Sequence, residues 1–165
     1  MSAVPAHGKP RGRHLARSAA RLAAVQALYQ IEMTGRDVAE VAAEFVVHRI
    51  EAPLDGLDLS AADKDFFRAL LFGVVDHQVE IDNLIARALA KDWTLERLDS
   101  ILRALLRAGA YEIASRADVP VRVAIDEYVE VARDFFEGEE PKFVNGILDA
   151  IARSARPAEM AAKPR

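Results

Sequence analysis

The sequence predicts an all-α fold, and three observations support that prediction. Ala and Leu dominate from His14 onward, apolar residues recur three or four positions apart, and β-branched residues do not alternate with polar ones. Hydrophobic residues make up 52% of the 165 residues, which is enough for a buried core. No internal repeat is evident that would indicate a solenoid. We therefore expect a compact bundle of about seven helices.

Capping residues mark the starts of several expected helices. Asp37 is followed three residues later by Glu40, which resembles a capping box, and Ser60 and Thr94 are suitable N-caps. The expected helices are residues 14–33, 37–49, 60–76, 78–91, 94–115, 120–135 and 141–154.

Prolines and glycines mark further boundaries. Pro120 and Pro141 suit the first turn of a helix, where a missing amide hydrogen removes no helical hydrogen bond. Gly35 and Gly138 can adopt the left-handed conformation that ends a helix. The longest expected loop is residues 51–59.

The first expected helix has a basic face and an apolar face. At 100° per residue, Arg13, Arg17 and Arg21 fall within about 80° of one another. The apolar stripe lies roughly 130° away from them. Such a row of arginines can bind phosphates or stack on bases, although similar rows also occur on solvated helix faces. The stripe consists of Leu15, Leu22, Val25, Tyr29 and Met33.

Positive charge is concentrated at the two ends of the chain, although the net charge is −4. Residues 1–31 contain no acidic residue, so the middle of the chain is strongly acidic. A basic end on an acidic body favours a localised contact with a polyanion, and a solvated end is the alternative. We expect a mobile basic arm over 1–13, a helical domain over 14–154 and a flexible basic tail over 155–165. The basic residues of 1–31 are Lys9, Arg11, Arg13, Arg17 and Arg21.

Several classes of function lack their characteristic residues. Cysteine is absent, which excludes disulfides, zinc–thiolate sites and thiol nucleophiles. The histidines are scattered, and no Gly-rich phosphate loop or HExxH pattern occurs. No apolar run approaches the ~20 residues that span a bilayer. We therefore expect a cytoplasmic protein with no catalytic residue, no cofactor, no metal site and no membrane contact.

Four segments together resemble one known family. They are RSAARLAAVQALY from Arg17, ILRALLRAGAYEI from Ile101, DVPVRVAIDEYVEVARDF from Asp118 and KFVNGILDAIA from Lys142. Their order and spacing resemble the NusB family of bacterial transcription antitermination factors. The resemblance covers nearly the whole helical region.

The resemblance implies a fold of two small helical subdomains and no catalysis. It implies binding of boxA-type single-stranded RNA together with NusE, the small-subunit ribosomal protein that doubles as a Nus factor. The same resemblance implies a role in processive transcription of ribosomal RNA operons, in a complex with other Nus factors and RNA polymerase.

The resemblance also implies RNA-binding residues in two segments. Arg17 and Arg21 match the arginine-rich start of the family's first helix, and Arg13 adds charge just upstream. Lys142 and Phe143 match the family's KFVNG element. A lysine in a first helical turn adds charge to unpaired amides and so favours a phosphate. Phe143 could stack on an unpaired base or pack in the core.

The resemblance places NusE on the side of the second subdomain that carries the 94–107 segment. From it we expect four partner-binding residues, which are Glu96, Asp99, Leu102 and Arg103.

Two alternatives remain from the sequence. One is a helical bundle that binds proteins without binding RNA. The other is the NusB-like domain found at the front of ribosomal RNA cytosine methyltransferases, which would need a cofactor-binding α/β domain and a catalytic cysteine.

Asp126 departs from the family pattern, because many members have Asn at this position.

Overall fold

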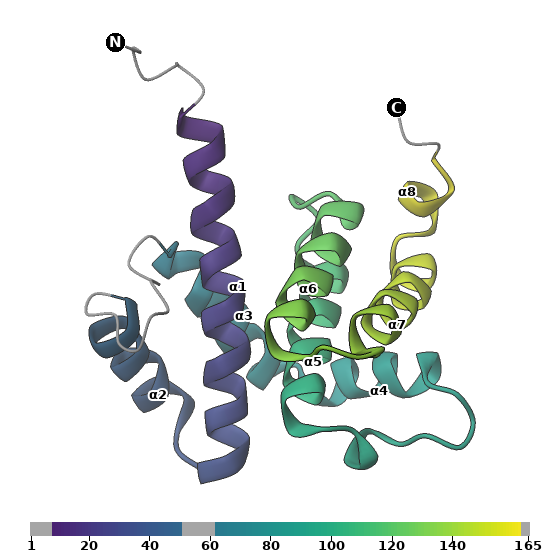
Figure 1. Ribbon diagram of the computed structural model, residues 1–165, viewed down its shortest axis with the longest axis horizontal. Helices are drawn as coiled ribbons and strands as arrows, with labels where there is room; N and C mark the ends of the chain where they lie inside the picture. The colour runs from purple at the N-terminus through teal and green to yellow at the C-terminus, as the bar shows by residue number, and fades with distance from the viewer. Residues whose placement is uncertain (1–7, 51–61, 163–165) are drawn as a thin grey trace. The chain divides into compact units, whose positions relative to one another are not determined.

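The computed structural model describes residues 8–50 and 62–162, and within them it contains helices and no strand (Figure 1). The predicted all-α class is therefore confirmed. The chain divides into two compact units, residues 1–71 and 72–165, in agreement with a fold of two helical subdomains. No helix among the described residues is long and apolar enough to cross a membrane.

The first unit is built on α1 (Gly8–Thr34), against which α2 (Val38–Phe45) packs. A short π-helix, η1 (Val46–Ile50), continues α2, and α3 (Lys64–Asp76) begins in this unit. Small side chains on α1 allow the close approach of α2, since a row of them is completely buried. These residues are Ala20, Ala23, Ala24 and Ala27.

The connection between α1 and α2 forms as the sequence predicts. Gly35 has a φ of 69°, in the left-handed region, and its amide donates to the carbonyl of Ile31 at 2.8 Å. The Asp37 side chain then accepts the amide of Ala39 at 3.1 Å and caps α2. Helix α1 already begins at Gly8, within the segment 1–13 that the sequence predicts to be an arm. Ser60, an expected cap, lies outside the described residues.

The second unit is organised around α5, which contacts α4, α6 and α7. Figure 1 shows α6 and α7 side by side above α5. A Cβ at Gly109 of α5 would lie 3.0 Å from Leu148 and 3.3 Å from Tyr128, so glycine permits this close packing. The described helices of this unit are α4 (Gln78–Ala88), η2 (Leu95–Arg97), α5 (Ser100–Ser115), α6 (Val121–Phe135), α7 (Glu140–Ala155) and α8 (Pro157–Ala161).

Two polar contacts fix the packing around α5. The Tyr128 hydroxyl on α6 donates to the buried carboxylate of Glu112 on α5 at 2.8 Å. On the other side, the Arg107 guanidinium forms two hydrogen bonds, of 2.8 and 3.0 Å, to the carboxylate of Asp82 on α4. Paired groups of this kind favour one register between the helices, because a shift would break these hydrogen bonds and leave the buried Glu112 carboxylate without the Tyr128 hydroxyl.

One expectation about the second unit is wrong. The helix expected over 94–115 is interrupted, because Asp99 caps a new helix and separates η2 from α5. Within residues 155–165, which the sequence predicts to be a flexible tail, α8 forms and Met160 is only 6% exposed. Burial of the Met160 side chain stabilises the packing of this short helix against the rest of the unit.

Candidate nucleic-acid and partner interface

Arg17 and Arg21 lie one turn apart on α1, and both guanidinium groups lie over the ring of Phe66. The guanidinium carbon is 4.6 Å from the ring centroid for Arg17 and 5.0 Å for Arg21. Arg21 is only 2% exposed, whereas Arg17 is partly exposed. The expectation that Arg21 belongs to an exposed arginine row is therefore wrong, since its guanidinium is packed against the aromatic ring. Arg13 lies within α1, and its side chain is outside the described residues.

Lys142 lies in the first turn of α7, directly after Pro141, as the sequence predicts. Its side chain is 85% exposed, and its ammonium is 3.7 Å from a carboxylate oxygen of Glu139. An exposed ion pair of this kind contributes little energy, so a phosphate can compete for the ammonium. The amides of the first turn and the helix dipole add positive potential at this place.

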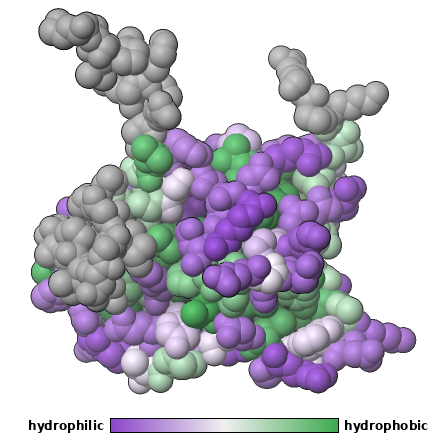
Figure 2. Space-filling view, viewed as in Figure 1, coloured by the Kyte–Doolittle hydropathy of each residue, from purple (hydrophilic) through white to green (hydrophobic). Residues whose placement is uncertain are grey.

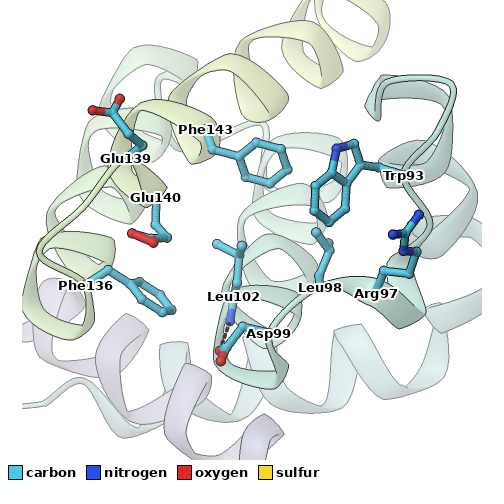
Figure 3. Close-up of a pocket in the computed structure, with 9 residues that line it drawn as sticks. All are labelled: Trp93, Arg97, Leu98, Asp99, Leu102, Phe136, Glu139, Glu140 and Phe143. Carbon is cyan, nitrogen blue, oxygen red and sulfur yellow. Dashed lines mark hydrogen bonds between the residues drawn. The ribbon is translucent and has the colours of Figure 1, made fainter.

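Phe143 forms part of an apolar pocket of about 370 Å³, which we call the aromatic pocket. In Figure 3 the rings of Phe143 and Trp93 point toward one another above Leu98 and Leu102. Phe143 is partly exposed, and Trp93 is 48% exposed. The pocket therefore offers the face of at least one aromatic ring to a ligand. Its apolar lining consists of Trp93, Leu98, Leu102, Phe136 and Phe143.

Two of the four expected partner residues also line the aromatic pocket. Leu102 lies at its base, and Asp99 lies at its edge (Figure 3). The structure therefore brings together, in one pocket, residues that the sequence assigned to RNA and to a protein partner. Glu96 is exposed on η2 and does not line this pocket.

Asp99 and Arg103 also hold the local structure. The Asp99 carboxylate accepts the amides of Ile101 and Leu102, at 2.8 and 3.3 Å, and so caps α5. The Arg103 guanidinium donates to the carbonyls of Leu95 and Leu98, both at 2.9 Å. These bonds tie η2 to α5, so a substitution at either residue would alter this segment itself.

Trp93 and Phe136 were not among the site residues expected from the sequence. Trp93 precedes η2 in a charged stretch, and an isolated aromatic residue among charges was the only signal for it. The Arg97 guanidinium lies over the Trp93 ring, with its central carbon 5.3 Å from the ring centroid. Phe136 follows the last residue of α6 at the end of the apolar stripe of that helix, so periodicity predicted a buried residue and not a place in a pocket.

A second pocket, of about 480 Å³, lies between α6 and α7 and is lined mostly by polar side chains. We call it the polar pocket. In Figure 2 hydrophilic residues gather over the outer side of α6, the helix that supplies one wall. Its polar residues are Asp126, Glu130, Arg133, Lys142 and Asn145.

No group of three or more His, Asp or Glu side chains that could hold a metal ion occurs among the described residues. His77 Nδ1 lies 3.8 Å from a Glu80 carboxylate oxygen, and these two residues are a pair and not a group of three.

Comparison with known proteins identifies the family. The NusB family model matches residues 18–153. The chain is 56% identical over 140 residues to the transcription antitermination protein NusB of Caulobacter vibrioides, covering 85% of this chain and 94% of that protein. It is 51% identical over 160 residues to NusB of Agrobacterium fabrum, covering 94% and 97%.

Solved structures agree with the sequence comparison. The structure of T. maritima NusB matches with a TM-score of 0.71 and 34% identity, covering 88% of this chain and 97% of that one. A chain from a crystal structure of the antitermination factors NusB and NusE in complex with double-stranded RNA has a TM-score of 0.68 and 28% identity. That match covers 83% of this chain and 96% of the other. Because one family model and these relatives each match most of its length, the chain belongs to the NusB family.

Proposed function

We propose that this chain is a transcription antitermination factor that binds boxA-type single-stranded RNA together with NusE. In this role it promotes processive transcription of ribosomal RNA operons in the bacterial cytoplasm, within a complex that includes RNA polymerase and other Nus factors. Membership of the NusB family is the observation that carries the proposal. Support also comes from the similar chain crystallised with NusE and RNA.

The RNA-binding residues that we propose are Arg13, Arg17, Lys142 and Phe143. Lys142 supplies an exposed charge beside the unpaired amides of α7, which suits a phosphate. Phe143 supplies a ring at an open pocket, which suits an unpaired base. Arg21 supports Arg17 indirectly, because it packs on the same ring and restricts how Arg17 is placed.

The NusE-binding surface that we propose includes Glu96, Asp99, Leu102 and Arg103. Glu96 is exposed and, unlike Asp99 and Arg103, its side chain forms no hydrogen bond among the described residues. A charge at the rim of an interface mainly affects specificity and association rate. Because Asp99 and Arg103 also hold the local structure, Glu96→Lys is a cleaner test of the surface than a change at either of them.

The test is a fluorescence anisotropy titration of a labelled 12-nucleotide boxA-type RNA, with and without NusE, at several salt concentrations. We expect salt-dependent binding that NusE strengthens. Because the similar crystallised complex contains double-stranded RNA, the same RNA annealed to its complement serves as a comparison. Binding of NusE with no binding of either RNA would favour the alternative, a bundle that binds only proteins.

The partner surface is tested by NusE pull-down with Glu96→Lys. We expect reduced capture with unchanged helical content by circular dichroism. Lys91→Glu is the control, because Lys91 is exposed nearby and lines neither pocket. Equal capture by the wild type and Glu96→Lys would move the interface elsewhere.

A further inference from the structure

The first turn of α7 separates two pockets of different chemistry. Phe143 faces the aromatic pocket, whereas Lys142 and Asn145 line the polar pocket. Helical geometry explains this separation, since Lys142 and Asn145 lie about 60° apart around the axis and Phe143 lies roughly 160° from Asn145. A single strand crossing this turn would therefore meet an aromatic surface on one side and a polar one on the other.

Two side chains in the polar pocket have no partner within the described part of the chain. They are the carboxylate of Asp126 on α6 and the amide of Asn145 on α7, for which no hydrogen bond or ion pair occurs. Their neighbours differ in this respect. Glu130 accepts a hydrogen bond from Arg133, and Lys142 lies near Glu139. Asp126 and Asn145 are thus the groups of this pocket that a ligand can engage without breaking a bond within the protein.

The chemistry of these two groups selects one type of nucleobase. An ionised carboxylate only accepts hydrogen bonds, and its two oxygens match two adjacent donors. Among the four RNA bases, only guanine has two adjacent donors, N1–H and N2–H, on its Watson–Crick edge. Adenine, cytosine and uracil each place an acceptor beside their donor on that edge, and a carboxylate would repel it. The amide N–H of Asn145 can in addition donate to the guanine O6.

We propose that the polar pocket is a subsite for an unpaired guanine, read by Asp126 and assisted by Asn145. Lys142, which also lines the polar pocket, holds a phosphate of the same strand, while a neighbouring base lies against Phe143 in the aromatic pocket. Recognition of the Watson–Crick edge requires an unstacked and unpaired base, as is common for sequence-specific RNA binding. This inference rests on the proposed RNA-binding function and adds a base preference to it.

Asp126 could instead only repel the phosphates of the RNA, and this role predicts a different effect of its removal. If its carboxylate only repels phosphates, its removal strengthens the binding of every RNA alike. If it reads guanine, its removal weakens only guanine-containing RNA. Asp134 provides the matched control, because it is also an exposed aspartate of α6 and lines neither pocket.

The experiment measures affinities of the wild-type chain, Asp126→Asn and Asp134→Asn by fluorescence anisotropy. The probes are 12-nucleotide uridine-rich RNAs with one central guanosine, inosine, adenosine or cytidine. A uridine background lets the strand slide until the single different base reaches the pocket. Inosine lacks only the N2 amino group of guanosine, so it removes one of the two donors. A duplex of the guanosine RNA with its complement shows whether the edge must be unpaired.

In the wild type we expect about tenfold weaker binding of the inosine RNA than of the guanosine RNA, as for loss of one hydrogen bond to a charged group. In Asp126→Asn this difference should disappear, whereas in Asp134→Asn it should persist. Equal wild-type affinity for guanosine and inosine overturns the subsite, and so does an Asp126→Asn variant that binds all four RNAs more tightly. Salt-dependent binding without any base preference would overturn the subsite alone, whereas no binding of any RNA would overturn the proposed function with it.

Discussion

Phe143 is a single residue at which base stacking and core packing make different predictions. Its ring lines the aromatic pocket and is partly exposed, so truncation removes a ligand surface more than a core contact. We expect Phe143→Ala to weaken RNA binding by roughly 1–3 kcal/mol, as for loss of one stacked base. Anisotropy titration measures the affinity, and a thermal melt measures stability.

Two further variants separate the roles of Phe143. Phe143→Trp keeps an aromatic face and should retain most of the RNA affinity, whereas Phe143→Leu keeps only apolar volume and should not. A core role would instead show as a stability loss of about 3–5 kcal/mol in Phe143→Ala, with normal affinity of the folded fraction. That combination would contradict the stacking role.

Arg21 is expected to contribute to stability more than to RNA binding. Its guanidinium is desolvated over Phe66, where a cation–π contact is worth about 2 kcal/mol or more. We expect Arg21→Ala to lower the free energy of unfolding by an amount of that order, measured by urea denaturation. Arg17→Ala, at a more exposed position, should cost less stability. An Arg21→Ala variant with wild-type stability but much weaker RNA binding would contradict this assignment.

The case of Arg21 shows what a helical pattern can and cannot predict about a site. The pattern places Arg17 and Arg21 on one face of α1, and both do lie over the same ring. It carries no information about which residue of another helix covers that face, so the burial of Arg21 by Phe66 was not predictable. The bonds of Asp99 to nearby amides are local, yet its place at the edge of a pocket depends on Phe136 and Phe143.

Among the elements, helix starts and stops with a local chemical cause were predictable. Gly35 ends α1, and Asp37 caps α2, since both depend only on neighbouring backbone. The break before α5 was not predicted, because apolar residues continue through it and Asp99, the cap that produces it, was expected to bind a partner. Helix α8 was missed because its order depends on tertiary contacts of Met160 and Glu159.

Helix α8 stabilises the start of α6 from a distance in the sequence. Pro120, the N-cap of α6, provides no side-chain hydrogen bond, and the Glu159 carboxylate accepts the Val121 amide at 2.5 Å instead. That backbone hydrogen bond, with a further contribution from the bonded Arg156 guanidinium, holds the pKa of Glu159 below its ordinary value. Loss of this cap in Glu159→Ala should cost about 1 kcal/mol at pH 7, measured by urea denaturation.

The lowered pKa of Glu159 fixes the direction of a pH effect. The contribution of this carboxylate to stability is complete above about pH 4.5, the ordinary pKa of a glutamate. It is lost as the pH falls through the lower pKa of the folded state. The stability difference between wild type and Glu159→Ala should therefore shrink below about pH 4.5. Glu137→Ala is the control, because Glu137 is exposed and has no such bond, and a constant difference across this range would contradict the capping role.

At the scale of the whole molecule, the proposed RNA-binding charges belong to different units. Arg17 lies in the unit of residues 1–71, and Lys142 lies in the unit of residues 72–165. If one RNA contacts both residues, each of the two positive charges releases about one counterion from the RNA. Arg17→Ala and Lys142→Ala should therefore each reduce the slope of log affinity against log salt concentration by about one. The double variant should then lower it by about two, because the counterions released by the two charges add. Arg87→Ala, which removes an exposed charge of α4, should leave the slope unchanged. A slope that responds to only one of the two substitutions would show that the RNA contacts a single unit.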